Sequence, residues 1–269
     1  MTAATRFREL HRPGNPLLMP NPWDAGSAKL LAWLGFEALA TTSSGFAATL
    51  GRLDGSVTRE EALVHAGAIV AATDLPVSAD LENCFAHDPE GVAETARGAV
   101  AAGLAGFSVE DYSGDDAKPI YERELAAERV RAAVEVAHAA PGAPLVVTAR
   151  AENYLHGHRD LSDTIARLQA YQEAGADVLF APGPVDAETV SAIVSSLDRP
   201  VNVLARAGAP SVGEMGALGV SRISVGGAFA FAAIEGLVAA GRELREQGTY
   251  GYLERTAAGA KAARDAFAT

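Results

Sequence analysis

Carboxylates stand at the ends of three separate apolar segments of this chain of 269 residues. The segments are PVSADLE, GFSVED and PLVVTARAE, and their acidic residues are Asp80, Glu82, Glu110, Asp111 and Glu152. Mg²⁺ takes oxygen ligands and usually keeps several waters, so it needs only a few protein carboxylates. If the fold brings the three ends together, they form an oxygen-rich pocket that suits Mg²⁺ and an anionic substrate.

Asp80 and Glu82 are the strongest candidates for metal ligands. They are two positions apart on one predicted strand, so their side chains should point the same way. Two carboxylates on one face repel each other unless a cation lies between them. We therefore expect Asp80 and Glu82 to hold Mg²⁺, or Mn²⁺ in its place, with Glu110 joining directly or through water. The alternative for each acid is that it caps the helix that follows its strand.

Arg150 is the one cation among these acids. It follows the run PLVVTA and should point into the same pocket. A guanidinium binds a carboxylate or a phosphonate through two parallel hydrogen bonds, so Arg150 is a candidate for substrate binding and catalysis. Glu152 is a further candidate contact for the substrate. A salt bridge from Arg150 to Glu152 or Glu110 is the alternative and does not exclude that role.

Two further polar features lie near strand ends. The run TTSSG closes the second apolar segment, and its hydroxyl and backbone groups could cradle a carboxylate through Thr42, Ser44 and Gly45. Asn202 is a polar residue inside an apolar run, so it either faces the substrate or satisfies a hydrogen bond in the core. The pair His156 and His158 follows the fifth segment and could reach the mouth of the site.

The elements that must position these residues alternate regularly between strand and helix. The eight expected strands are 17–23, 38–44, 76–82, 106–112, 144–152, 177–183, 200–205 and 222–227. The helical segments between and after them are 24–34, one opening at Thr58, 88–102, 122–140, 162–174, 186–196, 212–218 and 229–247. Continuously apolar strands are typical of parallel sheets covered on both faces. Eight strand–helix pairs predict a single (β/α)₈ TIM barrel spanning residues 1–269, with a helical extension at about 250–269 that packs outside the barrel or on a second subunit.

Composition excludes several classes of function. The net charge is −12 and no cluster of Lys and Arg occurs, which argues against binding to nucleic acid or to an anionic membrane surface. No apolar run is long enough to span a bilayer, and the N-terminus lacks the apolar core of a signal peptide. Cys84 is the only cysteine, so no intrachain disulfide can form. We expect a cytoplasmic protein in which Cys84 is a buried apolar residue, with a catalytic thiol as the alternative.

At this point the chain resembles the isocitrate lyase/phosphoenolpyruvate mutase superfamily. The matching pieces are SGF at 44–46, LGRLD at 50–54, SADLE at 78–82, VED at 109–111 and ARAE at 149–152 with Gly157. Each piece is short, but their order and spacing are specific and cover about residues 7–267. The resemblance implies a (β/α)₈ barrel whose final helix is swapped between subunits, in a homodimer or homotetramer.

The resemblance also implies a chemistry. Mg²⁺ would be held by Asp80, Glu82 and Glu110, and Asp54 would lie near the metal or on a gating loop. Ser44, Gly45 and Arg150 would hold the carboxylate of a small anionic 2-oxo acid. The shared reaction would cleave or form a C–C or P–C bond next to that acid, through an enolate bound to the metal.

The chain departs from the family pattern at informative places. The loop after the fourth strand reads DYSGDDAKPIYERE and lacks the cysteine motif of the C–C lyases. Thr42 stands where the phosphonate mutases carry a Trp, and Glu82 replaces the second Asp of the usual pair. Lys118, Tyr112 and a water under this loop are the candidates for the proton donor. We expect a C–C lyase, with a P–C mutase or hydrolase and a non-catalytic oxo-acid-binding barrel as alternatives.

Overall fold

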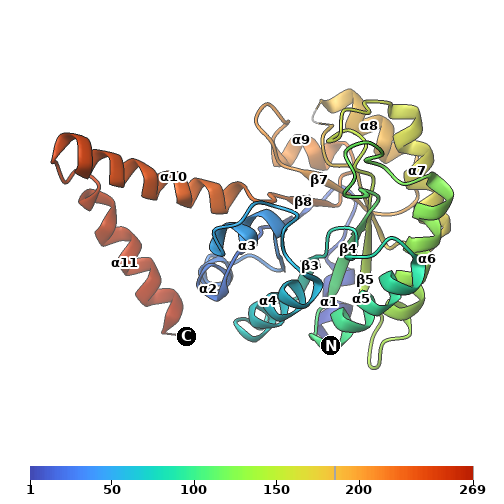
Figure 1. Cartoon of the computed structure of the whole chain (residues 1–269), viewed down its shortest axis with the longest axis horizontal. Coiled ribbons are helices and arrows are strands. Elements are labelled where there is room, and N and C mark those ends of the chain that lie inside the picture. Colours follow the sequence, from blue (N-terminus) through green and yellow to red (C-terminus); the bar gives the residue numbers. More distant parts are fainter. Residues whose placement is uncertain (185, 269) are drawn as a thin grey trace.

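The computed structural model describes residues 1–184 and 186–268 (Figure 1). Eight parallel strands pair in the order β1-β8-β7-β6-β5-β4-β3-β2. Their bounds are β1 Leu17–Met19, β2 Leu39–Ala40, β3 Val77–Asp80, β4 Gly106–Glu110, β5 Val146–Arg150, β6 Val178–Phe180, β7 Val201–Leu204 and β8 Arg222–Ser224. The predicted (β/α)₈ barrel is confirmed, with strands shorter than expected.

The barrel is closed between β1 and β2 by two hydrogen bonds rather than by a strand ladder. The backbone N–H of Ala40 donates to the carbonyl of Pro20 at 3.1 Å. The side-chain amide of Asn21 donates to the carbonyl of Thr41 at 2.9 Å, and its oxygen accepts from the backbone of Val225 and Gly226. Asn21 therefore ties the carboxyl ends of β1, β2 and β8 together at the mouth of the barrel.

Helices surround the strands, and the largest of three clusters of buried apolar side chains lies between the helices and the strands. Their bounds are α1 Ala3–Glu9, α2 Ala25–Trp33, α3 Ser43–Thr49, α4 Arg59–Ala71, α5 Pro89–Ala101, α6 Arg123–His138, α7 Leu161–Glu173, α8 Ala187–Ser195, α9 Val212–Ala217, α10 Ala228–Arg242 and α11 Leu253–Phe267. Most begin at a side chain that accepts from the backbone of the first turn, as Thr58 and Asp88 do. Within the described residues, every helix is too short or too polar to cross a bilayer.

Helix α3 corrects the expected end of the second strand. Residues 38–44 were predicted as strand, yet β2 ends at Ala40 and a helix begins at Ser43. The reason is local: the hydroxyl of Thr42 accepts from the backbone of Gly45 at 3.3 Å and caps a helix that the polar run TTSSG did not reveal. This change places the first turn of α3 at the mouth of the barrel.

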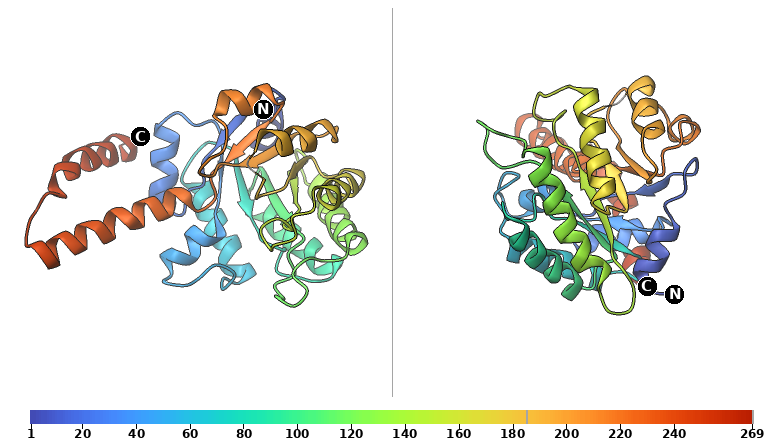
Figure 2. Two further views of the ribbon diagram at one scale, coloured as in Figure 1. Left: turned by 90° about the horizontal axis from the view of Figure 1, so that it is seen from above. Right: turned by 90° about the vertical axis from the view of Figure 1, so that its right-hand side faces the viewer.

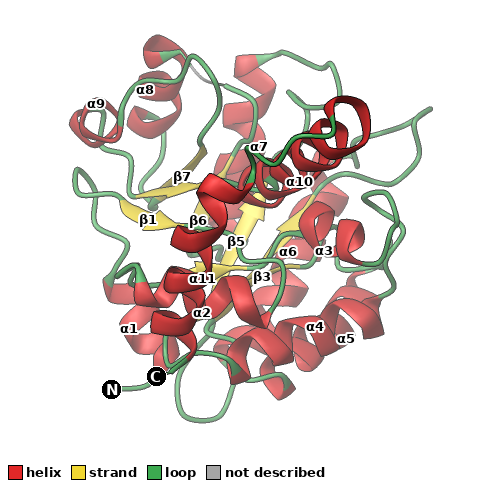
Figure 3. Ribbon diagram, turned by 90° about the vertical axis from the view of Figure 1, so that its left-hand side faces the viewer, coloured by secondary structure: helices red, strands yellow, loops and turns green. Residues whose placement is uncertain are grey.

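The C-terminal helices leave the barrel. Figure 1 shows α10 pointing away from the strands, and a π-helical turn over Glu243–Gln247 precedes the reversal into α11. Helix α11 then packs on α2, and Figure 3 views the molecule from the side on which α11 lies. The predicted helical extension is therefore present and lies outside the barrel.

The N-terminal helix α1 covers the opposite end of the barrel from α3 (Figure 2). Phe7 is fully buried in the barrel interior with Leu17 and Val146. His11, one turn further on, is also buried, and its Nδ1 lies 2.8 Å from the carbonyl oxygen of Phe7. Burial and the charge of Arg222 lower the pKa of His11 to about 3.

This buried histidine predicts a loss of stability in mild acid. The unfolded chain takes up a proton near pH 6.5 and the folded chain does so only near pH 3, so this contribution is present above pH 6.5 and lost as pH falls towards 3. The slope is at most about 1.4 kcal/mol per pH unit. Urea unfolding of wild type and His11→Gln at pH 7, 6 and 5 measures it. Equal slopes for the two proteins would contradict the assignment.

Candidate active site

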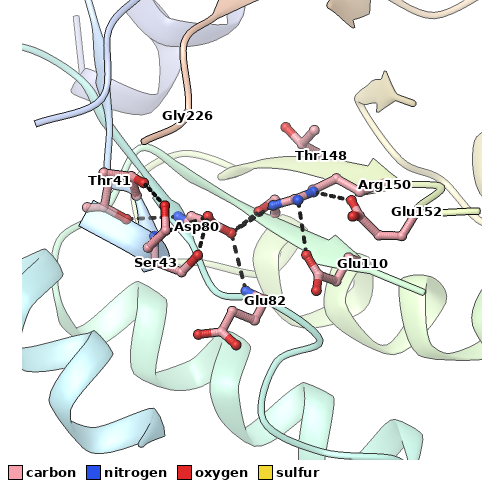
Figure 4. A network of polar contacts seen from close by, with 12 residues as sticks. Thr41, Ser43, Asp80, Glu82, Glu110, Thr148, Arg150, Glu152 and Gly226 are labelled. Carbon is pink, nitrogen blue, oxygen red and sulfur yellow. Dashed lines mark hydrogen bonds and ion pairs between the residues drawn. The ribbon is translucent and has the colours of Figure 1, made fainter. Parts of the chain in front are cut away.

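The three acidic strand ends meet around Arg150 (Figure 4). Its guanidinium lies 2.8 Å from Asp80 Oδ1, 3.2 Å from Glu110 Oε2 and 2.9 Å from Glu152 Oε1. These acids follow or end β3, β4 and β5, so neighbouring parallel strands deliver them to one mouth. The expected convergence is present, and so is the salt bridge between Arg150 and its acidic neighbours.

Burial and mutual charge shift the pKa values of this cluster. Burial alone would lower the pKa of Arg150, but Glu152, Glu110 and Asp80 outweigh it and hold that pKa well above its usual value. Burial raises the pKa of Glu110 well above its usual value and also raises that of Glu152, although Arg150 opposes both shifts. One guanidinium therefore stabilises three largely buried carboxylates.

Asp80 is fixed on both of its oxygens. Its Oδ2 accepts from the backbone N–H of Ser43 at 3.3 Å and from the Ser43 hydroxyl at 3.1 Å, while its own N–H donates to the hydroxyl of Thr41 at 2.9 Å. Oδ1 accepts from Arg150 and from the backbone N–H of Glu82 at 3.4 Å. The first turn of α3 thus positions Asp80, and Ser43 is a site residue that the run TTSSG did not single out.

Glu82 does not share a strand face with Asp80, and that expectation is wrong. Strand β3 ends at Asp80, and Glu82 has φ 50, a left-handed conformation in which the alternation of strand side chains no longer applies. Figure 4 shows its carboxylate pointing away from that of Asp80. Burial, followed by the charges of Asp80 and Asp54, raises the pKa of Glu82 to about 8.

Two adjoining cavities reach Arg150. One, of about 150 Å³, runs down into the barrel, and the other, of about 550 Å³, lies under the loops that follow β2, β4 and β5. Both are lined by Ser43, Asp54, Arg150 and Leu155. Burial raises the pKa of Asp54, although a hydrogen bond with Ser43 opposes the shift. Asp54 therefore comes from its long loop into the same acidic cluster.

The donor set suits a divalent cation. Five carboxylates, those of Asp54, Asp80, Glu82, Glu110 and Glu152, line the two cavities, and Arg150 is the guanidinium that both cavities share. In the described part of the chain no three His, Cys, Asp or Glu side chains already surround one point as a metal requires. Burial, followed by the charge of neighbouring carboxylates, raises the pKa values of Asp54 and Glu82, and Mg²⁺ with retained waters would favour their ionised forms.

The candidates from the TTSSG run are placed differently from one another. Thr42 and Ser44 line the inner cavity, and their hydroxyl oxygens are 3.2 Å apart. Gly45 is buried beside them, and a Cβ there would come within 2.5 Å of the Thr42 methyl and 3.2 Å of Trp23. The absence of a side chain at Gly45 thus serves packing of the first turn of α3.

Other predicted residues lie at the cavities or apart from them. Tyr112 and Glu152 line the outer cavity, where Tyr112 stacks on His156 at 3.9 Å between ring centroids. Asp111 turns away: it accepts from the backbone of Glu152 at 2.7 Å and from the hydroxyl of Tyr171 at 2.5 Å. Asp111 therefore positions Glu152 from behind and does not line either cavity.

Lys118 and Cys84 are also apart from Arg150. Lys118 lines a third cavity together with His87 and Arg167. Cys84 is fully buried in the core, and burial raises the pKa of its thiol to about 12. The expectation that Cys84 is a buried apolar residue is confirmed.

The inner cavity contains polar residues that the sequence analysis missed. Small hydroxyl side chains and one arginine line it: Ser78, Ser108, Thr148, Arg222 and Ser224. Asn202, which was predicted, joins them by donating to Ser224 Oγ at 3.0 Å. Asn202 was predicted because it is a polar residue inside an apolar run, and the same pattern could have identified Arg222. Thr148 could have been identified because it precedes Arg150 by two strand positions and therefore shares its face.

Comparison with known proteins agrees with this geometry. Residues 7–245 match the family model for phosphoenolpyruvate phosphomutase. A solved candidate lyase/mutase of Burkholderia cenocepacia is 51% identical, with a TM-score of 0.91 and coverage of 94% of this chain and 91% of that one. A candidate phosphonomutase of the same organism is 37% identical, with a TM-score of 0.84 and coverage of 92% and 98%. The 2,3-dimethylmalate lyase of Eubacterium barkeri is 30% identical over 201 residues, which are 72% of this chain and 68% of the lyase.

The family of the chain follows from these matches and from the site. The matching model spans most of the barrel and includes every residue placed around Arg150. The eight-stranded barrel, the acidic strand ends and the similar proteins all point the same way, to a group of enzymes that contains lyases and mutases. This chain belongs to the phosphoenolpyruvate phosphomutase family, within the isocitrate lyase/phosphoenolpyruvate mutase superfamily.

Proposed function

We propose that the protein is a Mg²⁺-dependent lyase that cleaves a C–C bond next to a 2-oxo or 2-hydroxy acid. The observation that carries the proposal is Arg150, held among three carboxylates at the mouth of the barrel and open to two cavities. The similarity to a 2,3-dimethylmalate lyase supports a C–C bond as the target.

The residues would divide the work. Arg150 and the hydroxyls of Thr42 and Ser44 would bind the carboxylate of the substrate, with Arg150 exchanging part of its contact with Glu152 for that carboxylate. Asp80, Glu82 and Asp54 would hold Mg²⁺, with Glu110 joining directly or through water. Bound Mg²⁺ supplies Lewis-acid stabilisation of the negative charge that develops on the substrate oxygen. The loops over the outer cavity would exclude water from the carbanion-like product of cleavage.

Tyr112 is the proton donor that the geometry favours. It lines the same cavity as Arg150, whereas Lys118 lines another one. Tyr112→Phe is expected to lower kcat by about 10²-fold or more, because a positioned acid contributes roughly that much. Lys118→Gln is the matched control and should leave kcat unchanged. Steady-state kinetics with a substrate identified by the panel described next measures kcat for both variants. A normal kcat for Tyr112→Phe would assign the proton to another group.

A substrate panel tests the reaction class. The protein is incubated with Mg²⁺ and a series of 2-alkylmalates, 2-alkylisocitrates and oxaloacetate, and the 2-oxo acid product, or the acetate released together with oxalate, is followed by proton NMR. Removal of Mg²⁺ by EDTA should stop the reaction and its return should restore it. Binding of these acids without turnover of any would favour the non-catalytic alternative.

A second candidate function is a P–C mutase or hydrolase acting on phosphonopyruvate-like substrates. The observation that favours it is the match to the phosphoenolpyruvate phosphomutase model, together with a candidate phosphonomutase at 37% identity. Phosphorus NMR of the enzyme with Mg²⁺ and phosphonopyruvate distinguishes it, because rearrangement or hydrolysis moves the phosphorus signal and a C–C lyase leaves it in place.

The pKa of Glu82 predicts how Mg²⁺ binding depends on pH. That pKa is raised to about 8, so at pH 7 Mg²⁺ must displace a proton and its affinity should rise from pH 6 to 9. In the metal-free protein, the folded chain holds this proton more tightly than the unfolded chain does. The free energy of unfolding should therefore fall as pH rises from 4.5 through 8. Calorimetry in buffers of different ionisation enthalpy measures the released proton. Glu82→Gln should remove proton release, and unchanged release would place the proton elsewhere.

The C-terminal arm, α10 through α11, is proposed to pack on a second copy in a homodimer or homotetramer. Helix α10 carries exposed apolar side chains, among them Phe231, Ile234 and Leu237. Figure 1 shows that α10 extends away from the barrel, which leaves this face of the helix available to a second copy. Light scattering coupled to gel filtration tests the assembly, and Leu237→Glu should shift it towards the monomer.

A further inference from the structure

Arg222 is a buried cation that has no acidic partner among the described residues. It begins β8 and lines the inner cavity, and only 3% of its surface is exposed. Its Nε donates to Asn202 Oδ1 at 2.9 Å, its Nη2 donates to Thr148 Oγ1 at 3.1 Å, and its Nη1 lies 3.2 Å from His11 Nε2. No carboxylate of the described residues lies within ion-pair distance of it. Arg150, which lines the same cavity, has three carboxylate partners, whereas the buried Arg129 donates to three backbone carbonyls.

All three partners of Arg222 are neutral. Asn202 and Thr148 carry no charge, and the low pKa of His11 keeps its ring neutral. With Nδ1–H donating to Phe7, the Nε2 of His11 is left as an acceptor for Arg222. Burial, followed by the charge of Arg150, lowers the pKa of Arg222 to about 9. A buried charge without a counter-charge destabilises the folded protein, and the positive charge of Arg222 lacks such a partner among the described residues.

The cavity beside Arg222 has room and donors for an anion. A guanidinium has five N–H groups, and each of its three nitrogens here has a single partner, which leaves one N–H on each terminal nitrogen. Two such N–H groups match the two oxygens of a carboxylate. The cavity holds about 150 Å³ and is lined by the hydroxyls of Ser78, Ser108 and Ser224.

We propose that the barrel interior contains a second anion site, formed by Arg222 with Thr148, Asn202 and Ser224, which takes a carboxylate or another small oxyanion. Thr148 precedes Arg150 by two positions on β5, a rise of about 6.6 Å, so the two guanidinium groups stand one layer apart along one cavity. That spacing suits the two ends of a short dicarboxylate. The anion is either the second carboxylate of a substrate, which rests on the proposed function, or a free inorganic oxyanion, which does not.

Anion binding without turnover tests the site. Calorimetry and thermal unfolding are measured at constant ionic strength with succinate, propionate and sulfate, on wild type, Arg222→Met and Arg199→Met. Arg199 is exposed, so its variant controls for the loss of one positive charge. Wild type and Arg199→Met should bind succinate or sulfate at least tenfold more tightly than Arg222→Met does. Thr148→Val, which keeps the charge, provides a second variant and should bind more weakly than wild type.

The outcomes separate the sources of the anion. Tighter binding of succinate than propionate, lost in Arg222→Met, assigns the site to a second carboxylate. Binding of sulfate with no preference for succinate assigns it to a free inorganic oxyanion. Equal affinities in wild type, Arg222→Met and Thr148→Val, or no binding to wild type, overturn the inference. A protein that binds succinate through Arg222 but cleaves no C–C bond keeps this inference and rejects the lyase.

Discussion

Replacing Arg150 by methionine is expected to lower kcat/KM by about 10²-fold or more and to lower the free energy of unfolding by about 3–5 kcal/mol. The activity falls because the carboxylate of the substrate loses its guanidinium partner. The stability falls because Glu110 and Glu152 remain buried without their counter-charge. Steady-state kinetics and urea unfolding at pH 8 measure the two effects.

The pH dependence of this variant provides its internal control. Without Arg150 the pKa values of Glu110 and Glu152 should rise further above their usual range. Acids with raised pKa values destabilise the folded protein as pH rises, so Arg150→Met should lose less stability at pH 5 than at pH 8. Arg150→Lys keeps the charge and should recover part of the stability but little of the activity. A variant as stable and active as wild type would contradict the central position of Arg150.

Replacing Asp80 by asparagine is expected to weaken Mg²⁺ binding more than tenfold and to lower kcat by about 10²-fold or more. Asparagine keeps the size of the side chain and an oxygen that can accept from Ser43, so the loss reports charge rather than shape. Mg²⁺ titration by calorimetry and steady-state kinetics measure both quantities.

Glu124→Gln is the matched control for Asp80→Asn. Glu124 is an exposed acid on the first turn of α6, and its loss changes the net charge by the same amount. It should bind Mg²⁺ and turn over substrate as wild type does. If Asp80→Asn retained Mg²⁺-dependent turnover at the wild-type level, the proposed metal site would be abandoned.

The barrel and the position of Arg150 could be predicted because both depend on simple spacing. Alternating apolar strands and capped helices predict a parallel barrel, and a parallel barrel brings all carboxyl strand ends to one mouth. Asp80, Glu110 and Glu152 meet Arg150 for that reason alone. The hydroxyl run at 41–45 could be placed at the mouth in the same way.

The remaining details depend on backbone conformation that spacing does not reveal. Glu82 leaves the strand with a positive φ, as do Cys84 and Phe85 after it, and no glycine marks the change. The cap formed by Thr42 starts a helix where a strand was expected, and this brings Ser43 to Asp80. The contact of Arg222 with Thr148 joins two strands that are not neighbours, β8 and β5, and spacing along the sequence does not reveal it.

The most direct test of the account is a single NMR experiment on the wild-type protein with Mg²⁺. A 2-alkylmalate and phosphonopyruvate are supplied in separate samples, and proton and phosphorus spectra are followed before and after addition of EDTA. The account predicts Mg²⁺-dependent release of a 2-oxo acid from the 2-alkylmalate or a close homologue, with the phosphorus signal unchanged. Rearrangement of phosphonopyruvate, or cleavage that proceeds equally well in EDTA, would contradict it.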